Sequence, residues 1–251
     1  MFDTHCHLAY KGMDSEKAIG NAKKAGLQGI VNCGYPRDLD KAMEIAEKHK
    51  GFVFQTFGLH PVDIIDMSEK EIADYFEFIR NNWRKCIAIG ECGLDYHWFK
   101  RRDSIENQLF KKTFSKSLKL AKELDLPIVL HTRKAEEECY KMVIEHDIEK
   151  AVFHCYSGNL SLADKIFDSG FFISIATNLL RSKTTKKLAQ RFPLEYILTE
   201  TDSPFLSPVP GQKNEPANVK MVVEEIAKAR EVSFELVDKH VIKNAKKFFK
   251  I

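Results

Sequence analysis

The chain has 251 residues, which is enough to bury a large core and fits either one α/β barrel or two ordinary domains. Hydrophobic residues make up 44% and charged residues 30%, a composition typical of a soluble globular protein. No apolar run approaches the roughly 20 residues that cross a bilayer, which argues against a membrane protein. The formal net charge of +3 is too small to indicate or to exclude nucleic-acid binding.

The six cysteines form no C-x-x-C pair, and a chain of this length needs no disulfides, so we interpret them as reduced thiols. The first residues show neither the basic nor the apolar segment of a secretory signal, and both features together predict a cytoplasmic protein. Cys6, Cys92 and Cys155 each directly follow a candidate metal ligand. Because side chains alternate along a strand, we expect these three thiols to pack away from that ligand.

Taken in chain order, short apolar runs alternate with amphipathic stretches along the whole sequence. The apolar runs predict eight strands, at residues 2–4, 28–34, 52–57, 86–89, 127–130, 151–153, 171–175 and 195–198. Helical spacing predicts helices at 14–25, 38–50, 105–124, 134–146, 160–168, 182–190 and 234–249, with another after the capping box at 68–71 and one opened by Pro216. The longest is expected to bury Ile105, Leu109, Leu118, Ala121 and Leu124.

Eight strand-and-helix repeats without a linker predict a single α/β domain over residues 1–251, of the size of a TIM (β/α)₈ barrel. A doubly wound open sheet also alternates strands with helices. The positions of ligand-type residues favour the barrel, because they lie at the carboxyl ends of strands one, four, five, six and eight: His5, His7, Glu91, His131, His154 and Asp202. Only a closed ring brings strands one and eight together, and barrel active sites lie at this face.

His5 and His7 point to one side of a strand, although such a pair alone could simply be hydrogen-bonded. With the other four residues they make four imidazoles and two carboxylates, a donor set that suits zinc, manganese, iron or magnesium. Six ligands exceed what one catalytic ion needs, so two divalent ions about 3.5–4 Å apart and bridged by a carboxylate fit better. Such a pair activates a water for hydrolysis of a phosphoester, amide or ester.

Six segments carry a more specific pattern: His5–His7, Gly90–Tyr96, His131–Arg133, His154–Gly158, Glu200–Pro204 and Asn214–Val219. In content and order they resemble the motifs of the TatD family of deoxyribonucleases, TIM-barrel members of the amidohydrolase superfamily. Two features depart from the family pattern: Tyr156 stands where phenylalanine is usual, and the end of strand seven, 175–180, matches less well.

The resemblance implies an activity, a cofactor and a ligand set. The activity is metal-dependent hydrolysis of phosphodiester bonds in DNA, as a 3′→5′ exonuclease on single-stranded ends. The cofactor is two divalent ions, with Mg²⁺, Mn²⁺ and Zn²⁺ as candidates. The ligands are His5 and His7 on one ion with Asp202 near it, Glu91 bridging both ions, and His131 and His154 on the second.

Each of these residues also has a structural interpretation. Glu91 is costly to bury unpaired, which favours a catalytic ligand role over a structural ion pair. His131 and His154, taken singly, are equally compatible with hydrogen-bonded core histidines. Asp202 fits a helix N-cap, but we interpret it as a catalytic aspartate beside the metal that takes the proton of the attacking water. Glu200, on the same strand face, fits a residue that supports a histidine ligand.

Substrate contacts are predicted at two positions. Arg133 shares the face of His131 and fits a bidentate phosphate clamp or, alternatively, a salt bridge. His60 ends strand three and fits a phosphate donor or a general acid, or else a turn histidine packed on Pro61. Further candidates for contact with nucleic acid are Lys100–Arg102, Asn214, Glu215 and Asn218, although Lys100–Arg102 fits a solvated turn equally well and Glu215 also suits a helix start.

Two other functions remain open at this point. The same site serves a deacylase acting on aminoacyl-tRNA or a small amide, because fold alone does not fix the substrate. A non-catalytic metal-binding scaffold is disfavoured, since no ligand is missing. A wide groove with exposed arginines favours nucleic acid, whereas a small closed apolar pocket favours the deacylase. The sequence predicts no membrane partner and leaves the oligomeric state open, a monomer being compatible with it.

Overall fold

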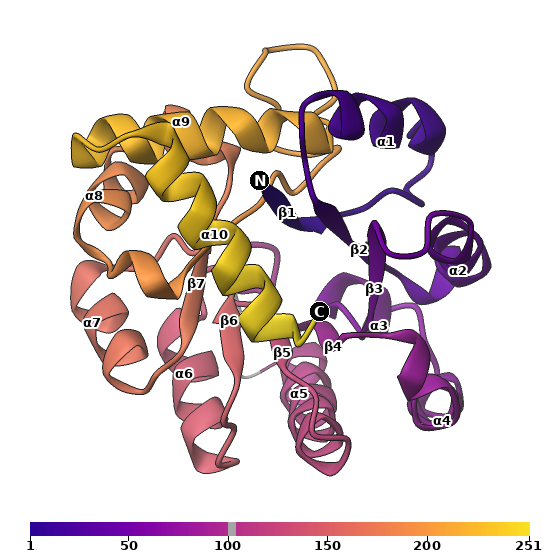
Figure 1. Cartoon of the computed structure of the whole chain (residues 1–251). Helices are drawn as coiled ribbons and strands as arrows, with labels where there is room; N and C mark the ends of the chain where they lie inside the picture. The colour runs from indigo at the N-terminus through magenta and orange to yellow at the C-terminus, as the bar shows by residue number, and fades with distance from the viewer. Residues whose placement is uncertain (100–103) are drawn as a thin grey trace.

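The computed structural model describes residues 1–99 and 104–251. Eight parallel strands form one sheet in which each strand pairs with the next in chain order, and helices surround it (Figure 1). The strands are β1 Phe2–Cys6, β2 Gly29–Gly34, β3 Val53–Phe57, β4 Ala88–Gly93, β5 Ile128–His131, β6 Ala151–Phe153, β7 Phe172–Ile175 and β8 Ile197–Thr199. This is the predicted TIM barrel.

The helices follow the strands around the outside of the ring (Figure 1). They are α1 Ser15–Lys24, α2 Leu39–Lys48, α3 Pro61–Ile64, α4 Glu69–Asn82, α5 Ile105–Glu123, α6 Glu136–Glu145, α7 Leu160–Asp168, α8 Lys183–Arg191, α9 Val219–Arg230 and α10 Phe234–Phe249. Short 3₁₀ turns lie at Pro36–Asp38, Trp83–Lys85, Thr177–Leu180, Leu194–Tyr196 and Pro216–Asn218. A search of the described part of the chain finds no helix with the length and apolar character that a bilayer crossing requires.

The ring closes where the first strand meets the last. Cys6 and Ser203 form a parallel bridge, and the Asp202 backbone N–H donates to the His5 carbonyl at 2.9 Å. The Thr4 hydroxyl also donates to the Thr199 carbonyl at 3.0 Å. Residues nearly 200 positions apart in the sequence therefore lie side by side, which a doubly wound open sheet would not allow.

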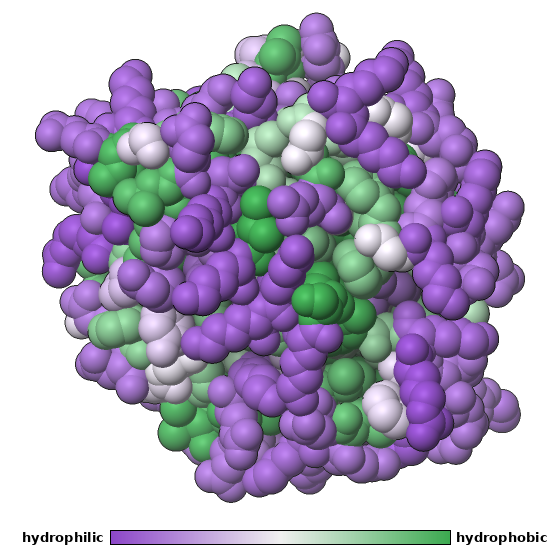
Figure 2. Space-filling view, viewed as in Figure 1, coloured by the Kyte–Doolittle hydropathy of each residue, from purple (hydrophilic) through white to green (hydrophobic). Residues whose placement is uncertain are grey.

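The amino ends of the strands are sealed by α10, which lies across the ring (Figure 1). Apolar side chains from seven strands form one buried cluster with the end of this helix: Phe2, Val31, Ala88, Val129, Val152, Phe172 and Leu198, with Ala245, Phe248 and Phe249. Viewed from this side, hydrophilic side chains cover most of the surface, and hydrophobic atoms show between them in patches (Figure 2). Because α10 and the apolar cluster close this end, a functional site on the barrel has to lie at the opposite end.

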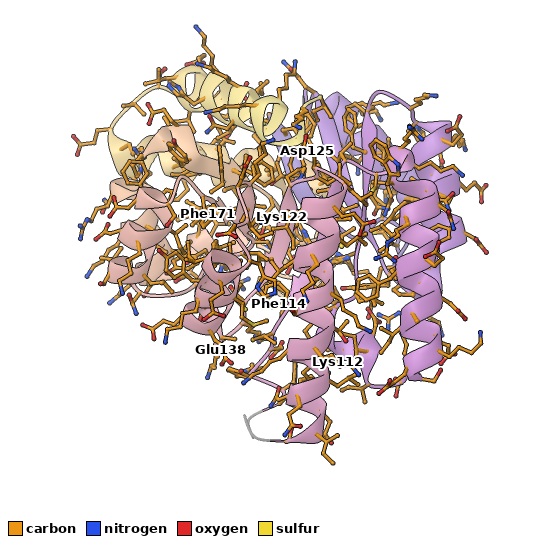
Figure 3. All side chains as sticks on the ribbon, turned by 90° about the horizontal axis from the view of Figure 1, so that it is seen from below. Lys112, Phe114, Lys122, Asp125, Glu138 and Phe171 are labelled. Carbon is orange, nitrogen blue, oxygen red and sulfur yellow. The ribbon has the colours of Figure 1, made fainter. Side chains whose placement is uncertain are left out.

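The longest helix, α5, corrects one detail of the prediction. Ile105 is 82% exposed rather than buried, whereas Phe110 and Phe114 lie in the core. At about 100° per residue, Ile105 lies about 180° around the helix from Phe114, so it faces solvent. Beyond the other end of α5, Asp125 accepts a hydrogen bond from Lys250 at 2.7 Å and ties this helix to α10 (Figure 3).

Several segments differ from the expected boundaries. The first strand was predicted to end at residue 4, but β1 continues to Cys6 and contains His5. Strand four was predicted to end at residue 89, but β4 continues to Gly93, so Glu91 lies inside the strand. Residues 194–196 form a 3₁₀ turn instead of the start of β8. The short helix α3 was not predicted, although Pro61 at its first position is a typical start signal. The capping box before α4 is confirmed, because Ser68 and Glu71 exchange both hydrogen bonds.

Candidate metal centre

The six predicted ligands converge at the carboxyl ends of the strands, beside one cavity of about 570 Å³. His60 and Arg133, predicted as substrate contacts, line the same cavity. Residues from five strands or strand ends thus come together, as the barrel prediction required. The Lys100–Arg102 segment, predicted as a contact with nucleic acid, lies outside the described residues.

Glu91 occupies the centre of this cluster and is only 4% exposed. Its Oε2 atom lies 3.4 Å from His5 Nε2 and 3.9 Å from His7 Nε2. Its Oε1 atom lies 2.7 Å from His131 Nδ1 and 3.0 Å from His154 Nε2. One carboxylate therefore presents a different oxygen to each of two histidine pairs, the arrangement that a carboxylate bridging two cations requires.

The first histidine pair has a second carboxylate beside it. The Nε2 atoms of His5 and His7 lie 3.3 Å apart, and Asp202 Oδ1 lies 3.3 Å from His7 Nε2 and 3.8 Å from His5 Nε2. These three atoms surround one small volume. Asp202 adopts a φ of 55°, which is uncommon for a residue other than glycine and is typical of functional sites.

Three of the four imidazoles are held from behind by an oxygen atom. These pairs are His7 Nδ1 with the Cys33 carbonyl at 3.1 Å, His131 Nε2 with Asp95 Oδ2 at 2.9 Å, and His154 Nδ1 with Glu200 Oε1 at 3.1 Å. When the outer nitrogen of a neutral ring donates its proton to this oxygen, the inner nitrogen keeps a lone pair for a cation. Histidines that bind metal ions in proteins are oriented in this way.

The charges of the cluster also fit divalent cations. Four carboxylates lie together in it: Glu91, Asp95, Glu200 and Asp202. Within the described residues every ion pair of these carboxylates is with a histidine, and no lysine or arginine neutralises them. Burial alone would raise the pKa of Glu91, but electrostatic attraction to the imidazoles around it, that of His154 foremost, holds it well below its usual range. Glu91 is therefore ionised and able to bind a cation.

The strands that carry these ligands are irregular at the ligand positions. Pairing of β1 with β2 shifts register between Asp3 and Cys6, and pairing of β4 with β5 shifts between Ile89 and Cys92. Irregularities of this kind are common beside active sites. His5 and Glu91 lie within the two shifted stretches.

A glycine lets β4 pass close to β5 at this point. Gly93 has a φ of 148°, and a side chain on it would place a Cβ atom 2.0 Å from the His131 carbonyl oxygen. Only glycine allows this approach. The motif Gly90–Asp95 therefore has a backbone requirement as well as a chemical one.

His60 lies on the β3 side of the cavity. Its Nδ1 accepts a hydrogen bond from the Val62 backbone N–H at 3.1 Å. Burial, and then the neighbouring His131, lowers the pKa of His60 to about 3. The ring is therefore neutral at pH 7, with its proton on Nε2, and it offers a hydrogen-bond donor to a bound group. A general-acid role is disfavoured, because the charged form is absent at neutral pH.

Two arginines stand at the mouth of the cavity. Arg133 is exposed and its Cζ lies 5.6 Å from the centre of the Trp98 ring. The ion pairs found among the described residues do not include Arg133, which favours the clamp interpretation over the salt bridge. Arg37 was not predicted; its Nη1 lies 2.8 Å from Asp63 Oδ1, and its Cζ lies 4.7 Å from the Tyr35 ring centre.

Three further candidates lie outside the lining of this cavity. Asn214 donates to the Thr201 carbonyl at 2.8 Å, and Asn218 donates to Asn214 Oδ1. Glu215 accepts from Asn21 at 2.8 Å, so the three residues brace the loop after β8, and their contact with nucleic acid stays a prediction. One expectation about the cysteines is wrong. Cys155 lines the cavity, because β6 has already ended at Phe153 and the alternation of side chains no longer applies.

Sequence reasoning missed three residues of the site. Cys33 forms a cluster of possible metal ligands with His5, His7 and Glu91. Asp95 orients His131, and Tyr35 stacks on His7 with ring centres 4.9 Å apart. Asp95 and Cys33 follow or end apolar runs, as the predicted ligands do, and that shared position was the available signal.

A TIM barrel that gathers imidazoles and carboxylates at the carboxyl ends of its strands is the architecture of a metal-dependent hydrolase. Residues 2–250 match the family model described as TatD related DNase, so the chain belongs to the TatD family of metal-dependent hydrolases.

Known proteins that resemble the chain match it along nearly its whole length. The uncharacterized metal-dependent hydrolase MJ1582 of Methanocaldococcus jannaschii is 39% identical, over 99% of this chain and 96% of its own. The 3′-5′ ssDNA/RNA exonuclease TatD of Pantoea ananatis is 30% identical, over 99% of both chains. Among solved structures, the TatD homologue YJJV of Escherichia coli superposes with a TM-score of 0.88 at 25% identity, over 100% of this chain and 98% of its own.

Proposed function

We propose that the chain hydrolyses phosphodiester bonds of DNA from the 3′ ends of single strands, using two divalent metal ions. The observation that carries this proposal is the position of Glu91, whose two carboxylate oxygens face two separate histidine pairs. Membership of the TatD family and a relative named as a single-stranded DNA and RNA exonuclease support it.

The proposed ligands follow from the distances around Glu91. They are His5, His7 and Asp202 for the first ion and His131 and His154 for the second, with Glu91 shared by both. When bound, the two ions would lower the pKa of a water and neutralise charge on the phosphoryl oxygens. Cys33 is not assigned as a ligand, because its Sγ already accepts the Glu91 backbone N–H at 3.2 Å.

The remaining steps belong to side chains of this protein. Asp202 is ionised, because contacts with His7, His154 and His5 lower its pKa against the effect of burial, and it accepts the proton of the attacking water. His60 donates from Nε2 to a phosphate oxygen, since its Nδ1 is occupied by a backbone N–H. Arg133, exposed at the mouth, binds a phosphate with its guanidinium group.

The shape of the cavity supports a polymer end rather than a small amide. A volume of about 570 Å³ with exposed Arg37 and Arg133 at its mouth suits a ligand that carries phosphates and continues beyond the cavity. A deacylase for a small amide would need a closed apolar pocket, whereas the lining of this cavity combines aromatic side chains with the two arginines and several carboxylates.

The test uses single-stranded DNA labelled at its 5′ end and protein stripped of metal with a chelator. Hydrolysis is measured without metal and after addition of Mg²⁺, Mn²⁺ or Zn²⁺. We expect metal-dependent shortening one nucleotide at a time, and immediate release of the label when it is moved to the 3′ end. Glu91→Gln prepared in the same way controls for a contaminating nuclease.

Two results would contradict the proposal. The first is absence of shortening with every metal while two ions are bound per chain, which would redirect the search to aminoacyl-tRNA and amide substrates. The second is binding of one ion per chain at saturation, measured by elemental analysis, which would remove the bridging role of Glu91.

A further inference from the structure

The rim of the cavity exposes large apolar side chains that the proposed chemistry does not use. Three such residues line the cavity from the segments that follow β3, β4 and β8: Val62, Trp98 and Phe205. Trp98 is 63% exposed and Phe205 is 40% exposed, and both line the cavity. Exposed aromatic rings cost solvation free energy, and when they gather beside a site they indicate contact with a ligand.

Trp98 is fixed relative to the metal centre. Asp95 Oδ1 accepts the backbone N–H groups of His97 and Trp98 at 2.8 and 3.0 Å. The other oxygen of Asp95 binds His131 Nε2 at 2.9 Å. The His97 ring packs edge-on against the indole, with centroids 4.8 Å apart. The indole is therefore held one carboxylate away from a proposed metal ligand, with the Arg133 guanidinium over its ring.

Phe205 has an equivalent place on the other side. Its backbone N–H donates to the Asp202 carbonyl at 2.9 Å, which anchors the ring to the opposite part of the metal centre. Tyr10 packs edge-on against it with centroids 5.1 Å apart, and His7 lies 5.7 Å away. Contacts with His7 and Tyr10 thus hold the Phe205 ring in place, while part of the ring remains exposed.

The strand order places these two rings across the mouth from each other. Trp98 and Arg133 follow β4 and β5, whereas Tyr10 and Phe205 follow β1 and β8. In a closed ring of eight strands in chain order, the β4–β5 pair lies opposite the β8–β1 pair. The metal ligands lie between them, so a chain that crosses the mouth meets one aromatic ring on each side of the centre.

We propose that Trp98 and Phe205 are stacking platforms for the two nucleobases that flank the scissile phosphate. This inference rests on the proposed function. Aromatic side chains bind single strands by stacking on bases without regard to sequence, and an arginine beside the ring adds attraction for the phosphate. Bases inside a duplex are already stacked and paired, so the two platforms select unpaired ends and tolerate any sequence.

The first experiment removes one base at a time. Single-stranded DNA is prepared with an abasic sugar at the last or the next-to-last position of the hydrolysed end. Base stacking on an aromatic residue is worth about 1–3 kcal/mol, so Trp98→Ala should raise KM about 5- to 150-fold and leave kcat within a few-fold. Trp98→Phe, which keeps a ring, should retain most of the affinity.

The combination of variant and substrate is decisive. For the wild-type protein, KM should rise by the same factor when one of the two bases is missing. For Trp98→Ala, KM on that substrate should rise no further. Phe205→Ala should show the same behaviour with the other base. Two results would overturn the stacking role and leave the proposed nuclease activity intact. In the first, base removal raises KM by the same factor in wild type and in Trp98→Ala. In the second, wild type hydrolyses abasic and intact ends equally.

A second measurement does not depend on turnover. Trp83 lies in the 3₁₀ turn before β4, away from the cavity, so Trp83→Phe leaves Trp98 as the single tryptophan in the sequence. In this variant we expect a non-hydrolysable phosphonate analogue of thymidine dinucleotide to quench tryptophan fluorescence, and the analogue without bases to leave it unchanged. Quenching by the dinucleotide analogue, together with no hydrolysis of any DNA, would support the base-binding site and contradict the proposed nuclease activity. Equal effects of the two analogues would overturn the platforms.

Discussion

The two ends of the barrel are built from the same eight strands and have opposite chemistry. At the amino ends the side chains are apolar, and α10 covers them with Phe248 and Phe249. At the carboxyl ends four imidazoles and four carboxylates surround an open cavity of about 570 Å³. The sealed end buries apolar area and so stabilises the fold, whereas the open end brings like charges together.

This difference shows where the fold accepts a cost. Backbone strain does not separate the ends, because left-handed φ values occur at Asp202 and Cys155 beside the cavity and also at Asp125 and Lys250 near the sealed end. Buried carboxylates do separate them, because burying charged groups is costly unless they are paired. Stability from the sealed end therefore offsets the charge gathered at the open end. Substitutions at the two ends should separate activity from stability.

The largest effect is expected for Glu91→Gln at the open end. Loss of the shared negative charge should lower metal-dependent hydrolysis on the order of 10³-fold or more, as removal of a central catalytic group does. Initial rates at saturating metal measure this loss. Glu123→Gln, which changes an exposed carboxylate on α5, is the matched control and should retain full activity. Comparable rates for both variants would remove Glu91 from the centre of the site.

The counterpart at the sealed end is Phe248→Ala. The side chain is 3% exposed and packs on Phe172 with ring centres 5.1 Å apart, so truncation should lower the free energy of unfolding by about 3–5 kcal/mol. Denaturant unfolding measures this change. The activity of the folded fraction should stay within about two-fold of wild type. A large loss of activity in the folded protein would show that the two ends are coupled.

The sequence predicts the division between the ends better than it predicts the contacts within each. Ligand-type residues after apolar runs, such as His131 and His154, were sufficient to place the ligands at one end of a barrel, because parallel strands all end at the same face. Glu200 was predicted to support a histidine and lies 3.1 Å from His154 Nδ1, but Asp95 and the Cys33 carbonyl, the partners of His131 and His7, were not predicted.

One failure has a local cause. Ile105 was expected in the core from the helical spacing of apolar residues, but it lies about 180° around α5 from Phe114 and faces solvent. The spacing identified the helix, whereas the limits of its buried face were not predictable.

Asp95→Asn tests the contacts that hold the ligands. The amide has one acceptor oxygen, so it cannot accept both from His131 Nε2 and from the backbone N–H groups of His97 and Trp98, and the charge that makes this imidazole a stronger ligand is lost. We expect metal affinity to fall about 10- to 100-fold, measured by calorimetric titration of the metal-free protein. Asp74→Asn, an exposed carboxylate on α4, should bind metal as wild type does. An unchanged affinity in Asp95→Asn would make Asp95 a purely structural residue.

The smallest effect should come from Asp63, which contributes a pH-dependent cost at the open end. Burial raises the pKa of this carboxyl to about 6, against the pull of Arg37, and one of its oxygens has no hydrogen-bond partner in the described structure. Its pKa in the unfolded chain is about 3.9, so the folded state binds the proton more tightly. The free-energy cost of holding this carboxylate charged in the folded state is therefore absent below about pH 4. It grows between pH 4 and 6 and is complete above pH 6.

Asp63→Asn removes this titration. The variant should gain about 1–3 kcal/mol of stability relative to wild type on going from pH 4.5 to pH 7.5, measured by denaturant unfolding at both pH values. Loss of the Arg37 contact affects both pH values, so the difference between them isolates the carboxyl group. Asp66→Asn, an exposed neighbour, should show no such difference. An equal effect of Asp63→Asn at both pH values would mean that Asp63 is already charged at no cost, and that the cost of buried charge at the open end is confined to the metal centre itself.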